Sequence, residues 1–278
     1  MRSEALPVGM REHARQDPDT PTLERLGGQA AGVALGKVGI SRNQRVIGIL
    51  ILGAIALIIA DAIAFSMWSS DARFSGMAML LFNLDTERNI PTWFSTVLLA
   101  YLAIVAWDIV PRGAGKVTCV AYAALAGVFL FLSADESAQL HERFANLIEV
   151  DGTFAKARWV LLWLPVAGVV GMALALAMWR SSRRLVIGLA IGATIYLTGA
   201  VGVETINTYN RDVEARKLEA AGVGVGTTRK YDLSEDRYGA ETWRYTLGTA
   251  AEEGLEMAGL ITWCAVLLAA RRRRVVDA

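Results

Sequence analysis

The sequence contains few of the residues on which several common protein classes depend. Cysteine occurs only twice, as Cys119 and Cys264, and both positions fall inside apolar segments. Two such residues cannot form an extracellular disulfide framework, and by themselves they cannot build a metal cluster. Proline occurs within a predicted membrane span only at Pro165, so the sequence gives little support for broken helices.

Common catalytic and phosphate-binding motifs are also missing. The chain contains no G-x-x-x-x-G-K-[ST] loop, no G-x-S-x-G and no H-E-x-x-H, and no order of Ser, His and Asp supports a nucleophilic triad. A net charge of +1 and the lack of a basic soluble domain argue against nucleic acid as a partner. The N-terminal segment has no apolar region beside a cleavage site, so a removed signal peptide is not predicted.

The chain is instead rich in apolar residues, which make up 54% of its 278 positions. They fall in blocks of roughly 20 residues, the length needed to cross a ~30 Å hydrocarbon layer. Two of the blocks, RVIGILILGAIALIIADAIAF and RWVLLWLPVAGVVGMALALAMW, are apolar on all sides and lack the polar stripe of a soluble helix. The sequence therefore predicts an all-α, polytopic membrane protein, a bundle of about six transmembrane helices in contact with the lipid bilayer. The six predicted spans are 46–68, 92–110, 117–135, 159–179, 184–205 and 247–270.

Lysine and arginine in short segments predict the orientation. They collect in the N-terminal segment, in the connections PRGAGK and RSSRR, and in the C-terminal RRRR. With six spans, these four segments lie on one side, so we expect a plasma (inner) membrane protein with both termini in the cytoplasm. The predicted organisation is a disordered cytoplasmic tail at 1–44, a six-helix domain at 45–271 with long outward loops at 69–91, 136–158 and 206–246, and a cytoplasmic tail at 272–278.

Acidic residues from four distant segments are predicted to lie at a similar height in the membrane. At ~1.5 Å per helical residue, Asp61, Asp135 and Glu204 lie about 24, 28 and 30 Å above the basic anchors of their helices. On the last span, Glu256 and Glu252 lie about 22 and 28 Å above Arg271 by the same measure. These heights place a layer of carboxylates in the outer third of the membrane.

The stretch GTAAEEGLEMAGL, residues 248 to 260, contributes most to this layer. Glu252 and Glu256 are four residues apart and share a helix face, with Glu253 on its flank. Gly248 and Gly259 continue that face, and small residues let another helix approach closely. We therefore expect one carboxylate cluster across the bundle, with Asp61 beneath it. Its expected members are Asp135, Glu204, Glu252 and Glu256.

A charged residue near the bilayer centre costs ~2.5–3.5 kcal/mol on insertion scales, so several acids need protonation, cationic partners or a bound metal. Carboxylates with one imidazole suit Mn, Fe or Zn, and an all-oxygen set suits Ca or Mg. The predicted metal ligands are Asp135, Glu136, His141, Glu204, Glu252, Glu253 and Glu256. The predicted supporting residues are Asp61, Glu142, Arg143, Arg211 and Arg244, the arginines being cations at the same level.

The position of His141 fits poorly with known carboxylate metal sites. Bundles that bind two iron ions use Glu-x-x-His, whereas His141 stands five residues after Glu136. On a regular helix these two side chains point about 140° apart.

Two polar segments outside the spans are also informative. The alternation of Asn83, Asp85, Glu87 and Asn89 is similar to a calcium loop, but it lacks the glycine and terminal glutamate of the EF-hand. We favour a polar cap before a helix that has Pro91 in its first turn. The segment NRDVEARKLEAAG predicts a helix that extends the fifth span outward.

The function favoured by the sequence is the binding of a cation or metal. The expected ligand is a small ion or small molecule that reaches the site from the outer side. Such a site could support redox or hydrolytic chemistry, and the sequence leaves open whether the protein is an enzyme. One alternative is a proton or cation transporter, which uses the same carboxylates as a relay. The other is a non-catalytic structural subunit, whose acids only pair with arginine.

Overall fold

The computed structural model describes residues 41–70, 72–111, 113–145, 158–220 and 243–277. Over these residues the chain forms helices and no strand, and six of the helices are long and apolar enough to cross a membrane. The predicted all-α bundle of six apolar helices is therefore confirmed. Most of the predicted 1–44 tail lies outside the described residues, as do parts of the predicted loops at 136–158 and 206–246.

The helices agree closely with the predicted spans. The connections after α2 and after α5 contain short helices, α3 (Ser75–Phe82) and α6 (Leu140–Ala145). The fifth span continues from α8 through a π-helical segment, η2, into α9. Five of the long helices are α2 (Arg42–Ser69), α4 (Ile90–Asp108), α5 (Lys116–Ala138), α7 (Arg158–Trp179) and α10 (Trp243–Asp277). The fifth span belongs to a continuous run of three segments, α8 (Arg183–Leu197), η2 (Thr198–Val203) and α9 (Glu204–Ala220).

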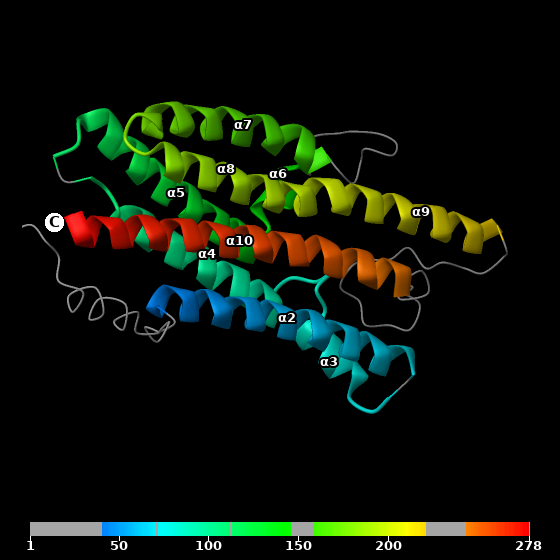
Figure 1. The fold of residues 1–278 in the computed structure, drawn as a ribbon. Helices are drawn as coiled ribbons and strands as arrows, with labels where there is room; N and C mark the ends of the chain where they lie inside the picture. Colours follow the sequence, from blue (N-terminus) through cyan, green and yellow to red (C-terminus); the bar gives the residue numbers. More distant parts are fainter. Residues whose placement is uncertain (1–40, 71, 112, 146–157, 221–242, 278) are drawn as a thin grey trace, which may run out of the picture. The chain divides into compact units, whose positions relative to one another are not determined.

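Helix α10 lies at the centre of the bundle (Figure 1). It packs against α2, α4 and the continuous rod formed by α8, η2 and α9. Its residues Met257, Cys264 and Leu267 are almost completely buried. Helix α7 is peripheral, because it packs against α5, α6 and α8 and no residue of its apolar window is buried. The central position of α10 places its glutamates inside the bundle.

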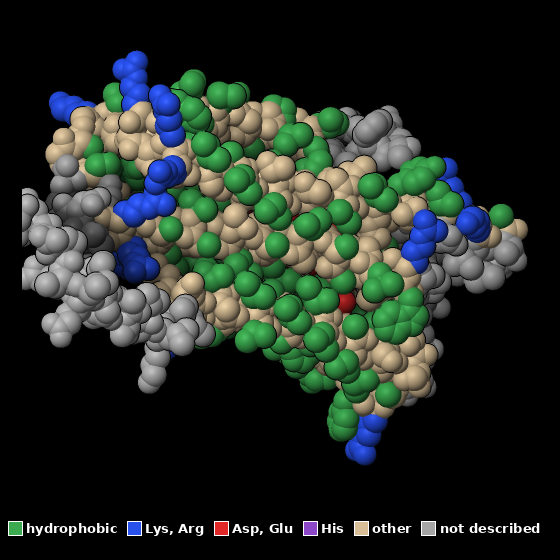
Figure 2. All heavy atoms as spheres, in the orientation of Figure 1, with side chains coloured by type: hydrophobic (Ala, Val, Ile, Leu, Met, Phe, Trp, Pro, Cys, Tyr) green, Lys and Arg blue, Asp and Glu red, His purple; other side chains and the backbone are tan. Residues whose placement is uncertain are grey.

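The outer surface between the two ends of the bundle is largely apolar. Ile49, Leu52, Val169 and Leu176 are each at least 68% exposed. On the face drawn in Figure 2, lysine and arginine side chains gather at the ends, and hydrophobic side chains cover the zone between them. In a bilayer these side chains contact acyl chains. This explains why the spans are apolar on all sides: one side faces the core and the other faces lipid.

Glycine allows α10 and α8 to pack at close range. A Cβ added at Gly259 would lie 2.7 Å from the Cβ of Tyr196 and 3.0 Å from the carbonyl oxygen of Gly192. Farther along α10, a Cβ at Gly248 would meet the side-chain amide of Asn207. The prediction that the glycine face of the last span admits another helix at close range is therefore confirmed, and the partner is the α8–η2–α9 rod.

The π-helical segment η2 was not predicted from the sequence. It covers TGAVGV, and Gly199 within it touches α10 so closely that an added Cβ would lie 2.5 Å from the carbonyl oxygen of Glu252. Short π-helical turns inside α-helices are rare. Where they do occur, they often lie at functional sites. The irregular turn of the fifth span thus lies directly beside the glutamates of α10.

Candidate functional site

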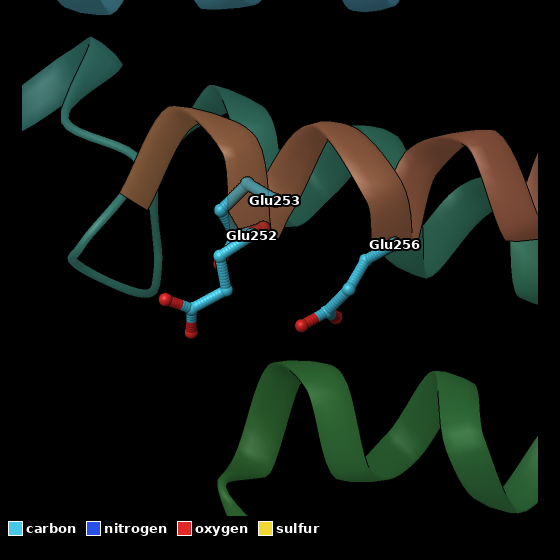
Figure 3. A group of neighbouring side chains, drawn as sticks. All are labelled: Glu252, Glu253 and Glu256. Atoms are coloured by element: carbon cyan, nitrogen blue, oxygen red, sulfur yellow. The ribbon is translucent and has the colours of Figure 1, made fainter. Parts of the chain in front are cut away.

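Three glutamates of α10 form the centre of the candidate site. One carboxylate oxygen from each of Glu252, Glu253 and Glu256 can be chosen so that all three lie within 4.8 Å of one another. All three side chains are partly buried. Figure 3 shows the carboxyl groups of Glu252 and Glu256 projecting from the same side of α10. The shared face expected from their four-residue spacing is present.

Side chains from the surrounding helices complete the cluster. Glu136 near the end of α5 lies within electrostatic range of both Glu253 and Glu256. Glu204 at the start of α9 lies within electrostatic range of Glu256. The hydroxyl of Tyr196 on α8 donates a hydrogen bond to the Glu256 carboxylate. Acids from three helices therefore meet at one level of the bundle.

Asp135 and His141 form a hydrogen-bonded pair beside this cluster. One oxygen of Asp135 accepts from the backbone N–H of His141 at 2.7 Å, and the other lies 3.0 Å from His141 Nδ1. Both side chains are partly exposed, and His141 lies within electrostatic range of Glu136. A carboxylate on Nδ1 fixes the tautomer of the ring and directs Nε2 outward as a metal ligand or base.

The sequence-based helical phase of His141 was wrong because α5 does not continue through it. The helix ends at Ala138, and Gln139 takes a left-handed conformation with φ of 54°. The chain then restarts as α6, so the ~140° separation of a regular helix does not apply to Glu136 and His141. A left-handed glutamine gives no sequence pattern that could have revealed this turn.

A tryptophan of α7 links this pair to the start of α9. The ring of Trp159 meets that of His141 edge-on at 5.2 Å, and its Nε1 donates to the Glu204 carboxylate at 3.4 Å. The side chains of Asp135, His141, Trp159 and Glu204 thus follow one another around one side of the cluster. Of the expected cluster members, Glu204 lies in electrostatic range of Glu256, and Asp135 lies in electrostatic range of Glu136.

The connection between α3 and α4 covers the other side. Asn89 caps α4 by accepting from the backbone N–H of Thr92 at 3.1 Å, with Pro91 in the first turn. This confirms the predicted polar cap. Asp85 of the same connection accepts a 2.6 Å hydrogen bond from the hydroxyl of Tyr245 and lies in electrostatic range of Glu253.

Asp61 belongs to this connection rather than to the glutamate group. Its side chain is only 2% exposed, and its carboxylate accepts from the backbone N–H of Leu84 at 3.1 Å. Its charged neighbour is Asp85. Asp61 therefore holds the connection against α2, and through Asp85 it borders the site.

The predicted arginine partners differ in how far the structure describes them. The side chains of Arg143 and Arg244 are exposed. The side chains of Glu142 and Arg211 lie outside the described residues. The proposed pairing of the acids with arginine therefore remains a prediction.

Three members of the site were missed by the sequence-based prediction. Tyr196 lies within an apolar span, where an aromatic residue gives no sign of its partner. Asp85 and Glu87 were assigned only to a helix cap, although Glu87 lies in electrostatic range of Glu136. A helix cap with acids at alternate positions, next to a buried carboxylate layer, is the pattern that could have indicated them.

Comparison with known proteins connects the chain to one family model. No curated protein and no solved structure matches the sequence. The family described as "Domain of unknown function (DUF8692)" matches residues 49–270. This range begins in α2 and ends in α10, so it includes every acid described above. The chain therefore belongs to the DUF8692 family.

Proposed function

We propose that this integral membrane protein binds a divalent cation at the α10 glutamates. The observation that carries the proposal is the mutual spacing of 4.8 Å among one oxygen each of Glu252, Glu253 and Glu256. Oxygen and nitrogen ligands of one ion stand ~2.0–2.6 Å from it, and so within about 5 Å of one another. Three carboxylates at this spacing need little movement to share an ion.

The charges around these glutamates support the same function. Glu136 and Glu204 add two carboxylates within electrostatic range of Glu256. Carboxylates gathered in a membrane interior repel one another and are costly to desolvate. A divalent cation offsets both costs at once. Tyr196, which donates to Glu256, holds one carboxylate in a fixed orientation.

The Asp135–His141 pair extends the range of ions that the site can take. Metal-ligating histidines commonly donate their second ring nitrogen to a carboxylate, and Asp135 provides that carboxylate at 3.0 Å. With His141 as a ligand, Mn, Fe or Zn is favoured. With oxygen ligands alone, Ca is favoured.

The test is metal analysis of the protein purified without chelators and reconstituted in nanodiscs. We expect close to one divalent ion per chain, and loss of that ion in the double variant Glu252→Gln/Glu256→Gln. Asp108→Asn is the matched control, because Asp108 is a carboxylate at the opposite end of the bundle, paired with Arg271 at 2.6 Å. Absence of bound ion, together with no heat of binding for Mn, Zn or Ca, would exclude this function.

A second candidate function is transport of a cation or proton along the same carboxylates. The observation that favours it is η2, because transporters bind ions where a membrane helix departs from regular geometry. Flux measured in proteoliposomes distinguishes the two functions. Ion-dependent flux that is abolished by Glu256→Gln would establish transport, and stoichiometric binding without flux would establish a binding site alone.

A further inference from the structure

A cavity lies at the opposite end of the bundle from the glutamates. Its volume is about 360 Å³, and it opens between the connection after α4, the turn between α7 and α8, and the last turns of α10. We call this the basic end, because α8 begins there with Arg183 and Arg184 and α10 ends there with a run of arginines. Figure 2 shows lysine and arginine side chains gathered on this end.

The polar part of the cavity is positively charged. Arg184 of α8 and Arg273 of α10 both line it, and no acidic side chain of the described residues does so. The nearby carboxylate of Asp108 is bound to Arg271 at 2.6 Å, and Arg271 does not line the cavity. Two guanidinium groups from different helices thus converge on one space. Guanidinium groups are well suited to phosphate oxygens.

The backbone at this place also favours an anion. Ser181 and Ser182 line the cavity, and Ser182 caps α8 by accepting from the backbone N–H of Leu185. The cavity therefore borders the N-terminus of a 15-residue helix, where the helix dipole favours negative charge. The two serine hydroxyls add neutral hydrogen-bonding groups beside the guanidiniums.

The remaining walls are mostly apolar. Ile109, Leu185 and Val266 line the cavity, and the first two are almost completely buried. The cavity lies where α4 ends and α8 begins, which is the boundary level of the predicted spans. A ligand that fits must place an anionic group at the boundary and apolar groups behind it.

We propose that this cavity binds the phosphate headgroup of an anionic glycerophospholipid. Basic pockets between membrane helices are a general mode of recognition for such headgroups. A volume of about 360 Å³ lies within the usual range of ligand pockets. Inorganic phosphate shares the anionic chemistry but makes no use of the apolar walls.

Native mass spectrometry of detergent-purified protein, titrated with phosphatidylglycerol, tests the proposal. Loss of one guanidinium group that lines the cavity should weaken anionic lipid binding about fivefold, so Arg184→Gln/Arg273→Gln should weaken it about 30-fold. Arg184→Gln alone should weaken it about fivefold. Arg183→Gln is the matched control: it removes the same charge one residue away, but Arg183 lies over the ring of Trp179 and does not line the cavity.

A second variant tests the cavity without changing charge. Ala269 lines the cavity and is exposed, so Ala269→Phe should fill the space and reduce lipid binding while the fold is kept. Equal binding by Arg183→Gln and Arg184→Gln, or undiminished binding by Ala269→Phe, would overturn the proposal. Inorganic phosphate should not displace the lipid at millimolar concentration. If it binds as tightly as phosphatidylglycerol, the cavity is a site for a soluble anion and the lipid proposal is wrong.

Discussion

The proposed cation site depends on a few carboxylates whose neighbours come from other helices. Glu256 illustrates this at the scale of a single residue. Its position four residues after Glu252 places both on one face of α10, but its hydrogen bond from Tyr196 and its proximity to Glu136 depend on how the helices pack. Substitutions at single residues therefore separate a metal site from a set of structural ion pairs.

Glu256→Gln should leave folding nearly unchanged and reduce bound metal. Glutamine retains an oxygen that can accept the hydrogen bond of Tyr196, but it removes the charge that an ion requires. Thermal unfolding in detergent and metal content, measured on the same preparation, check this. A loss of about 3–5 kcal/mol in the free energy of unfolding, as for a broken buried ion pair, would show that an arginine rather than a metal neutralises this residue.

Asp135→Asn should weaken metal binding by about 10–100-fold, the usual effect of losing the partner that orients a ligating histidine. The variant keeps a similar shape but loses the carboxylate that holds His141 Nδ1 at 3.0 Å. Isothermal titration with Mn and Zn measures the effect. Ser137→Ala is the control, because Ser137 is exposed at the same end of α5. Equal affinity for both variants would mean that His141 takes no part in binding.

At the scale of the helices, the site exists because α10 can lie very close to the α8–η2–α9 rod. Gly259 and Gly192 meet near Tyr196, and Gly199 meets the backbone of Glu252. Small residues at these positions let the two elements approach until backbone touches side chain. A wider spacing would carry Tyr196 and Glu204 away from the α10 glutamates.

Gly259→Ala should destabilise the protein by about 1–3 kcal/mol, the usual cost of overpacking. The added Cβ would lie 2.9 Å from the backbone nitrogen of Tyr196, which cannot yield without moving α8. Unfolding in detergent measures the effect. Gly127→Ala is the matched control in α5, because nothing lies within 4 Å of its added Cβ. We expect it to be neutral or to stabilise by up to about 1 kcal/mol through helix propensity, and equal effects of both changes would contradict close packing at Gly259.

At the scale of the whole molecule, the carboxylate site and the basic cavity lie at opposite ends of the bundle. The acidic site lies where α5 ends and α9 begins, and the basic cavity lies where α8 begins. Between Glu252 and Arg271, α10 runs for about 28 Å, close to the thickness of the hydrocarbon layer. The carboxylate site and the basic cavity therefore lie at the levels of opposite leaflets.

Reporter fusions after residues 44, 114, 182 and 278 should all indicate the cytoplasm, and fusions near residues 80, 150 and 225 should indicate the outside. The expected orientation follows from the basic bias of the two terminal and two short connecting segments. An outside result at residue 278 would reverse the orientation, and the glutamates would then face the cytoplasm.

The sequence alone was sufficient for the spans and for the level of the acids. A block of ~20 apolar residues has one stable arrangement in a bilayer, so the spans can be counted and Glu252 and Glu256 placed by height and phase. Gly248 and Gly259 were likewise recognisable as close-contact positions, because a small residue on a polar face within a span has few other uses.

Only the tertiary structure decided which side chains surround these acids. The π-helical turn η2 and the left-handed Gln139 change where Glu204 and His141 lie, and neither leaves a periodic pattern. The connection of Asp85 and Glu87 is placed by Asp61 and Tyr245, which are distant in sequence. The hydrophobic pattern of a segment indicates whether it forms a helix surrounded by lipid. The side chains that meet in a site depend instead on contacts between helices, which a single sequence does not encode locally.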